Sequence, residues 1–295
     1  MDNLIPKLES AERRRRRRLL FRHNKIPVRL LVPNFFTVLS LCAGLTAIRM
    51  AIELRFEMAI ALIVVAAMLD GVDGRVARLL KAQSKFGAEL DSLADFVNFG
   101  VAPAVVIFIW GLGPLKGPGW ITALALALAL GLRLARFNTM IDVEKPKWQS
   151  NYFTGMPAPA CAITVLLPLY IEYLGAFDVR SYPVMIALYM LVIGTLAVST
   201  LPTFSGKLLG ERIPREYVLP IFLGVAALFG FLLTYPFGTL TLLTLVYLAT
   251  IPMAYRRYAR KMKEPVLDVG QTSAADERIP GEPRIEDIPV NETKH

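Results

Sequence analysis

The sequence is poor in cysteine and in charged residues. Cys42 and Cys161 are the only cysteines among 295 residues, and both lie in apolar segments. This excludes a scaffold built on disulfides and predicts two inert thiols in the core. The first 29 residues are basic and polar, so they lack the apolar stretch and cleavage site of a secretory signal peptide. No internal repeat and no second globular domain is visible.

Apolar residues dominate the chain instead. Hydrophobic residues make up 55% of it, charged residues make up 19%, and the mean hydropathy is +0.48. This composition excludes an ordinary soluble domain and predicts an all-α polytopic membrane bundle. A membrane-spanning helix needs about 20 apolar residues. We predict eight such helices, at about 31–52, 56–80, 91–112, 119–140, 158–175, 182–203, 216–235 and 237–255.

The positive charge predicts an orientation in the membrane. The net charge is +9, and six consecutive arginines, Arg13 to Arg18, precede the first apolar segment. Lysine and arginine recur in every second connection, which favours cytoplasmic loops and anionic lipid over nucleic acid as the partner. We therefore expect both termini in the cytoplasm of a bacterium, with the bundle in its inner membrane. The predicted parts are a basic segment at 1–30, a transmembrane bundle at 31–255, and a basic stretch with a disordered tail at 256–295.

Four aspartates lie where the second apolar segment ends and the third begins. Asp70 and Asp73 are spaced i,i+3, and Asp91 and Asp95 are spaced i,i+4, so each pair projects from one helix face. Carboxylates beside a membrane span are costly and indicate a functional site. Four convergent carboxylates repel one another unless cations lie between them. Hard oxygen ligands of this kind predict Mg²⁺ or Mn²⁺.

Small and basic residues accompany the aspartates. Gly74 follows Asp73, Arg78 shares a helix face with Gly74, and Gly87 precedes Asp91 by one helical turn. A glycine lets a ligand or a backbone approach closely, and an arginine on the same face can hold a phosphate. Helix packing for the glycines, and a topology-setting charge for Arg78, are the alternatives that these residues leave open.

The combined pattern is D-x-x-D-G-x-x-A-R-(x8)-G-x-x-x-D-x-x-x-D, and it is complete from Asp70 to Asp95. It resembles the signature of the CDP-alcohol phosphotransferases, integral membrane enzymes that transfer a phosphatidyl or similar group to an alcohol and release CMP. The resemblance implies two divalent cations held by all four aspartates, with Asp95 also acting as the base. It implies CDP-diacylglycerol contacts from Asn34, Thr37, Gly74, Arg78, Ser84 and Gly87.

Asn34 and Thr37 also allow a simpler structural interpretation. They belong to the element P-N-F-F-T, which starts at Pro33 at the beginning of the first apolar segment. Judged from the residues alone, this element is more typical of a polar cap at the start of a helix.

Several stretches resemble the serine-using branch of this family, the integral-membrane phosphatidylserine synthases. They are P-N-F-F-T at 33–37, V-N-F-G-V-A-P-A at 97–104, R-L-A-R-F-N at 133–138 and F-T-G-M-P-A-P at 153–159. The resemblance implies CDP-diacylglycerol and L-serine as substrates, and the family's tendency to dimerise implies a homodimer.

Two arginines bear on the identity of the acceptor. Arg133 and Arg136 lie i,i+3 on one face, where an arginine fork suits a serine carboxylate, although both are equally explained as cytoplasmic topology residues. Glycerol 3-phosphate or choline as acceptor is the nearest alternative. A cation transporter is a further alternative, and it would place its carboxylates near the middle of the bilayer on several helices.

Overall fold

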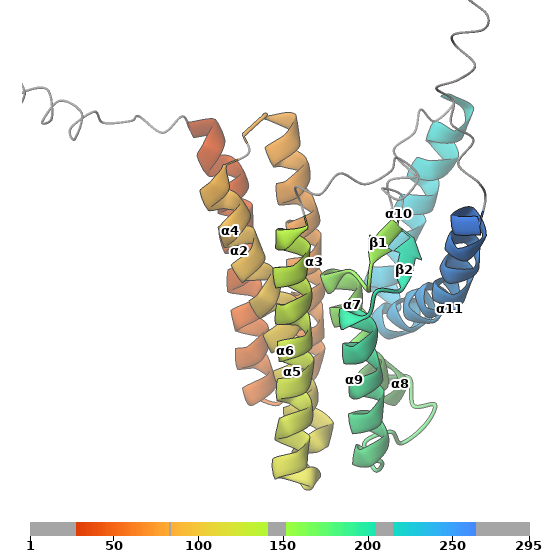
Figure 1. Ribbon diagram of the computed structural model, residues 1–295. Coiled ribbons are helices and arrows are strands. Elements are labelled where there is room, and N and C mark those ends of the chain that lie inside the picture. Colours follow the sequence, from red (N-terminus) through yellow and green to blue (C-terminus); the bar gives the residue numbers. More distant parts are fainter. Residues whose placement is uncertain (1–27, 83, 141–151, 205–214, 264–295) are drawn as a thin grey trace, which may run out of the picture.

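Helices form almost all of the computed structural model, which describes residues 28–82, 84–140, 152–204 and 215–263 (Figure 1). The all-α prediction is confirmed for the bundle. The elements are α2 (Val28–Ile52), α3 (Phe56–Leu79), α4 (Lys85–Asp95), η1 (Phe96–Val101), α5 (Ala102–Ile107), η2 (Phe108–Leu112), η3 (Gly113–Leu115), α6 (Gly117–Thr139), β1 (Tyr152–Thr154), α7 (Ala158–Val165), α8 (Leu167–Tyr173), α9 (Pro183–Val198), β2 (Pro202–Phe204), η6 (Arg215–Tyr217), α10 (Val218–Thr234) and α11 (Pro236–Lys263).

Small residues bring the first helices together. Ala47 and Ala51 of α2 and Ala59 of α3 are fully buried where the two helices pack along their lengths. Alanine leaves room for a close helix–helix approach, which is how membrane helices gain packing energy in the absence of a hydrophobic driving force. The pair therefore forms a rigid wall from which the later site residues project.

The third apolar segment is one continuous helical stretch from α4 to η3. It begins at Lys85, before the predicted 91–112, because the Ser84 hydroxyl accepts a hydrogen bond from the Gly87 N–H at 3.0 Å and caps the helix. The stretch changes to π-helical geometry at η1, directly after Asp95. Pro103 lies just beyond and has no N–H to give to the carbonyl four residues earlier. π-turns of this kind are frequent at functional sites.

A short two-stranded antiparallel sheet, which the sequence did not predict, interrupts the helices. β1 pairs with β2 in the register Phe153 opposite Thr203. Gly155 follows β1 with φ +78°, and an added Cβ would lie 2.6 Å from the Ala197 carbonyl oxygen. The F-T-G element therefore requires glycine both for its backbone conformation and for its contact with the end of α9.

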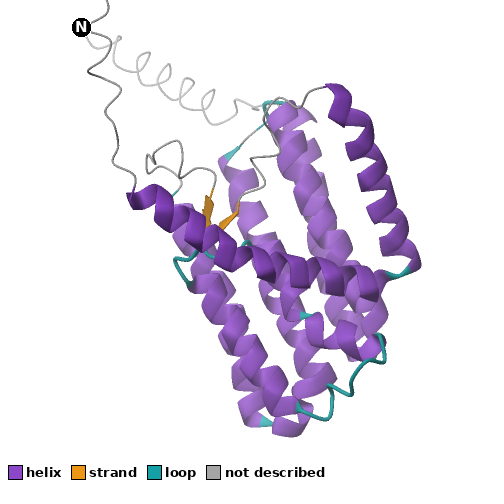
Figure 2. Ribbon diagram, turned by 90° about the vertical axis from the view of Figure 1, so that its right-hand side faces the viewer, coloured by secondary structure: helices purple, strands orange, loops and turns teal. Residues whose placement is uncertain are grey.

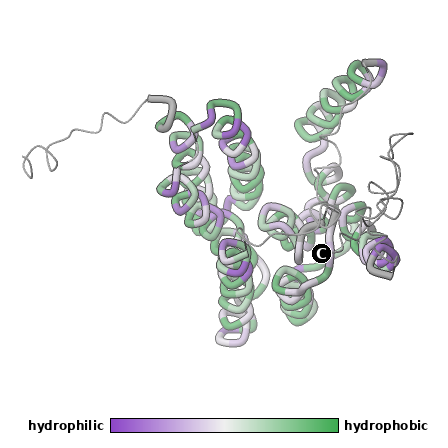
Figure 3. Tube along the Cα trace, turned by 45° about the horizontal axis from the view of Figure 1, so that its top comes forward, coloured by the Kyte–Doolittle hydropathy of each residue, from purple (hydrophilic) through white to green (hydrophobic). Residues whose placement is uncertain are grey.

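The apolar character of the helices identifies a multi-pass membrane protein. Four helical stretches are long and apolar enough to cross a membrane, namely Leu31–Ile52, Lys85–Leu115, Gly117–Thr139 and Pro236–Lys261. The stretches Ala158–Tyr173, Pro183–Val198 and Val218–Thr234 are apolar but shorter. Hydrophobic residues run along most of the helices (Figure 3), and many large ones are exposed. Cys161 is buried as predicted, whereas Cys42 is exposed.

The last described helix is long and lies at an angle to the other helices (Figure 2). α11 extends through the predicted last span into the basic stretch as far as Lys263, and it lies obliquely across the other helices beside the two strands (Figure 2). Its contacts include β2 and α8. The predicted N-terminal arginine run and most of the predicted tail lie outside the described residues.

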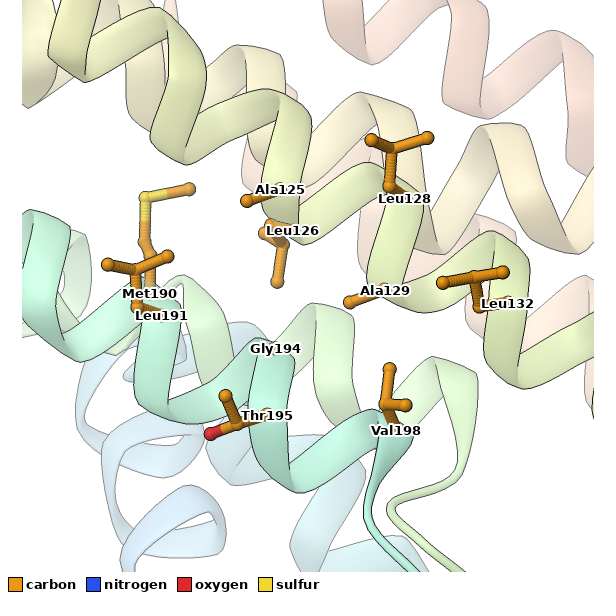
Figure 4. Close-up of a pocket in the computed structure, with 10 residues that line it drawn as sticks. All are labelled: Ala125, Leu126, Leu128, Ala129, Leu132, Met190, Leu191, Gly194, Thr195 and Val198. Carbon is orange, nitrogen blue, oxygen red and sulfur yellow. The ribbon is translucent and has the colours of Figure 1, made fainter.

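An apolar groove of about 300 Å³ runs between α6 and α9 (Figure 4). Leu126, Leu132 and Met190 are among the residues in its walls, and Thr195 is the one polar side chain there. A groove of this composition on a membrane helix suits contact with hydrocarbon and offers no group for chemistry. The polar site lies elsewhere, between α2, α3 and α4.

Candidate active site

Three of the four predicted aspartates converge. Asp70 comes from α3, while Asp91 and Asp95 come from α4, and one carboxylate oxygen of each lies within 4.8 Å of the others. Asp95 Oδ1 is buried and has no hydrogen-bond partner among the described residues. Within those residues, no lysine or arginine forms a salt bridge with any of the three. Three neighbouring carboxylates without a salt bridge fit a divalent metal, for which they supply hard oxygen ligands.

Asp73 has a different environment from the three. It is 4% exposed, and its Oδ2 accepts a hydrogen bond of 2.8 Å from Thr37 Oγ1 on α2. Its carboxylate is not one of the converging oxygens, but it lines the same cleft as Asp91. Thr37 is therefore a hydrogen-bond partner of an aspartate, whereas the residues alone favoured a polar helix cap. The hydrogen bond fixes one oxygen of Asp73 and orients the other.

A cleft of about 270 Å³ adjoins the aspartates. Five of the six predicted donor-binding residues line it, together with two of the aspartates. The lining residues come from three helices and one connection. They are Pro33, Asn34 and Thr37 of α2, Asp73, Gly74 and Ala77 of α3, Ala82, and Ser84, Gly87, Ala88 and Asp91 at the start of α4. Arg78, the sixth, is exposed on α3 one turn after Gly74 and does not line the cleft.

The two glycines of the motif shape this cleft in different ways. A Cβ added to Gly87 would lie 2.8 Å from Asn34 Oδ1 and 3.1 Å from Ser84 Oγ, so glycine allows α4 to approach α2. A Cβ added to Gly74 would meet no atom within 4 Å, because this glycine faces the open cleft. Gly87 thus sets the distance between two helices, and Gly74 leaves space for a ligand.

A buried polar chain links the helices that carry the aspartates. Asn98 of η1 donates from Nδ2 to Ser40 Oγ at 2.8 Å, and Ser40 donates to the Ala66 carbonyl oxygen at 2.9 Å. A Cβ added to Gly44 would lie 2.0 Å from Asn98 Oδ1, so Gly44 makes room for this side chain. Ser40 and Gly44 were not among the residues predicted to belong to the site. A polar residue within an apolar span was the only available signal.

The two predicted acceptor arginines have separate environments. Arg133 is 8% exposed, and its Nε is buried without a hydrogen-bond partner. Its guanidinium lies within electrostatic range of Asp95. Arg136 instead donates from Nη2 to the Ser199 carbonyl oxygen at 3.0 Å, which ties α6 to the end of α9. Only Arg133 therefore has an unsatisfied buried donor next to the aspartate cluster.

Comparison with known proteins agrees with this site. A protein-family model described as CDP-alcohol phosphatidyltransferase matches residues 30–201, and one described as CDP-alcohol phosphatidyltransferase 2 matches residues 216–252. The chain is 40% identical to a CDP-diacylglycerol–serine O-phosphatidyltransferase of Mycobacterium leprae, over 76% of this chain and 74% of that protein. It is 39% identical to the enzyme of that name from Mycobacterium tuberculosis, over 77% and 78%. The corresponding figures for the Helicobacter pylori enzyme are 37%, 59% and 73%.

Proposed function

The chain belongs to the CDP-alcohol phosphatidyltransferase family, and on this basis we propose that it transfers the phosphatidyl group of CDP-diacylglycerol to the hydroxyl of L-serine. The products are phosphatidylserine and CMP. The observation that carries the proposal is the convergence of Asp70, Asp91 and Asp95 beside the cleft that contains five predicted donor-binding residues. This arrangement joins a place for phosphate with a place for the cations that phosphoryl transfer uses.

The cleft between α2, α3 and α4 holds the CDP group of the donor. The capped N-terminus of α4 lines it, and backbone N–H groups at a helix N-terminus bind phosphate well. Gly74 leaves room for the diphosphate, and Asn34 and Ser84 offer polar atoms to the nucleotide. Arg78 is exposed on α3, beyond the cleft. After a rotation of its side chain, it contacts the phosphates of the donor. The acyl chains remain in the bilayer.

The four aspartates hold two Mg²⁺ or Mn²⁺ ions. Asp70, Asp91 and Asp95 supply the converging oxygens, and Asp73 lines the adjoining cleft with one oxygen bound to Thr37. Ions held there would neutralise the charge of the diphosphate and would stabilise the departing CMP. Asp95 accepts the proton of the serine hydroxyl while the serine oxygen bonds to the phosphatidyl phosphorus and the bond from phosphorus to CMP breaks. Its unpartnered Oδ1 is the oxygen available for that proton.

Arg133 is the better candidate for the serine carboxylate. Its buried Nε lacks a partner, and an arginine fork binds a carboxylate with two parallel hydrogen bonds. Arg136 donates a hydrogen bond to the Ser199 carbonyl oxygen, so its main role is to position α6. An acceptor with its carboxylate on Arg133 lies close to Asp95, as proton transfer requires.

The proposal includes eight spans and a cytoplasmic site in a bacterial inner membrane, and the positions of the helix ends support the orientation of the site. The start of α2 and the ends of α3, α6 and α11 lie toward one end of the bundle (Figure 1), which is where the predicted cytoplasmic segments attach. The aspartates lie toward the same end, since Asp73 and Asp91 flank the connection between α3 and α4. We keep the homodimer as part of the proposal on the family resemblance.

An acceptor screen tests the function. Purified protein in lipid or detergent receives CDP-diacylglycerol and Mg²⁺ or Mn²⁺, together with L-serine, glycerol 3-phosphate, choline or no acceptor. We expect CMP release and phosphatidylserine only with serine. Release with another acceptor alone would replace the substrate, and no release with any of them, with cation flux across liposomes, would favour the transporter.

A further inference from the structure

Two buried polar residues outside the donor cleft link the helices that carry the aspartates. We propose that Ser40 of α2 and Asn98 of η1 are positioning residues for the divalent-metal site, because their hydrogen bonds set the separation of α3 and α4. The inference deepens the proposed function and rests on its metal site. Neither residue contacts a substrate in this scheme, so each acts through the helices that it joins.

The metal site is divided between two helices. Asp70 comes from α3, whereas Asp91 and Asp95 come from α4. Direct contacts between α3 and α4 are few, while α2 packs against both helices and against η1. The spacing of the three carboxylates therefore depends on α2. A divalent cation is sensitive to this spacing, because distances to its ligands must hold to within about 0.2 Å.

Ser40 connects the two halves of the metal site. Its hydroxyl donates to the Ala66 carbonyl oxygen of α3 at 2.9 Å and accepts from Asn98 Nδ2 at 2.8 Å. Within an α-helix that carbonyl oxygen also accepts the N–H of Asp70, so Ser40 bonds to the helical turn that holds this aspartate. Asn98 lies three residues after Asp95, in the π-helical turn that follows it. The hydrogen bonds thus run from the turn of one metal ligand to the turn of another.

A second contact on α2 holds α3 at another point. Thr37 precedes Ser40 by three residues, and its hydroxyl donates to Asp73 Oδ2 at 2.8 Å, two turns along α3 from Ala66. Ser40 and Asn98 are each 1% exposed, so water does not compete for their hydrogen bonds. Hydrogen bonds between membrane helices add little to stability on average. The relative position that these bonds impose on α3 and η1 is therefore their main consequence.

The variants Ser40→Ala and Asn98→Ala test the proposal through direct binding of Mn²⁺. Each variant removes the link between the two residues, and Asn98→Ala leaves the bond from Ser40 to Ala66 in place. Electron paramagnetic resonance measures free Mn²⁺ in a titration of the purified full-length protein without substrates. We expect the Kd for Mn²⁺ to rise about tenfold in both variants, the lower end of the effect typical of residues that orient metal ligands. In the CMP-release assay, saturating Mn²⁺ should restore most of the kcat.

Tyr189→Phe is the matched control. The Tyr189 hydroxyl donates to the Thr164 carbonyl oxygen at 2.6 Å and joins α9 to α7, and neither helix carries an aspartate of the site. The control removes a hydrogen bond from a side chain on one helix to a carbonyl oxygen on another, as Ser40→Ala does. We expect it to leave the Kd for Mn²⁺ at the wild-type value, whatever its effect on the Tm.

Three results would overturn the inference. One is a wild-type Kd for Mn²⁺ in the two variants, and another is an absence of Mn²⁺ binding by the wild-type protein. The third is a lower Tm with a loss of kcat that saturating Mn²⁺ does not restore, which would make Ser40 and Asn98 packing residues. Failure of the proposed function looks different, because the variants would then still bind Mn²⁺ more weakly than the wild-type protein, while none of the proteins forms phosphatidylserine.

Discussion

Replacement of Gly74 by alanine separates donor binding from folding. The added Cβ would meet no protein atom within 4 Å and would point into the cleft of about 270 Å³. Alanine favours a helix interior over glycine by up to about 1 kcal/mol, so α3 should be no less stable. If the donor fills the cleft, the methyl group overpacks it, which typically costs about 1–3 kcal/mol. That range corresponds to an increase of about five- to 150-fold in the KM for CDP-diacylglycerol.

The assay is CMP release at saturating serine with varied CDP-diacylglycerol, together with a thermal unfolding curve. Gly71→Ala is the control, because Gly71 lies one turn earlier on α3, also has open space around an added Cβ, and does not line the cleft. A wild-type donor KM in Gly74→Ala would show that the donor does not occupy this cleft. A lowered Tm would show that the added methyl group clashes with protein atoms instead.

Four further outcomes are expected. Asp95→Asn should lose most phosphatidyl transfer while the protein still inserts and folds, because it removes both a metal ligand and the base; near-wild-type turnover would refute the role. Chelation of divalent cations should abolish CMP release, and Mg²⁺ or Mn²⁺ should restore it; turnover in excess chelator would contradict the metal site. Arg133→Ala should raise the serine KM about ten- to a hundredfold, whereas Arg136→Ala should mainly lower the Tm through loss of its bond to Ser199; equal effects on both substrates from both variants would refute the distinction. Gly155→Ala should lower stability by about 1–3 kcal/mol in thermal unfolding, because of its positive φ and a carbonyl oxygen 2.6 Å from the new Cβ; an unchanged Tm would contradict this contact.

Much of the fold and of the candidate site could be predicted from patterns among neighbouring residues. Composition and apolar runs predicted a helical membrane protein, and each of the eight predicted segments coincides with described helices to within a few residues at most ends. The largest differences are at the third segment, whose helix starts at Lys85 because of the cap at Ser84, and at the last segment, whose helix continues to Lys263. The spacing of the aspartates predicted that each pair projects from one helix face, and five residues that the motifs singled out for the donor line one cleft. Helix periodicity and the cost of charge in an apolar segment are properties of neighbouring residues, so the sequence alone reveals them.

Contacts between distant segments were decided only by the tertiary structure. Thr37 engages one of the four aspartates, Asp73, while the other three converge, and no spacing rule distinguishes them. Arg133 and Arg136 are equivalent by periodicity, yet one is buried near Asp95 and the other bonds to a carbonyl oxygen 63 residues away. Which groups meet depends on how the helices pack, and that packing is a property of the whole chain rather than of any segment within it.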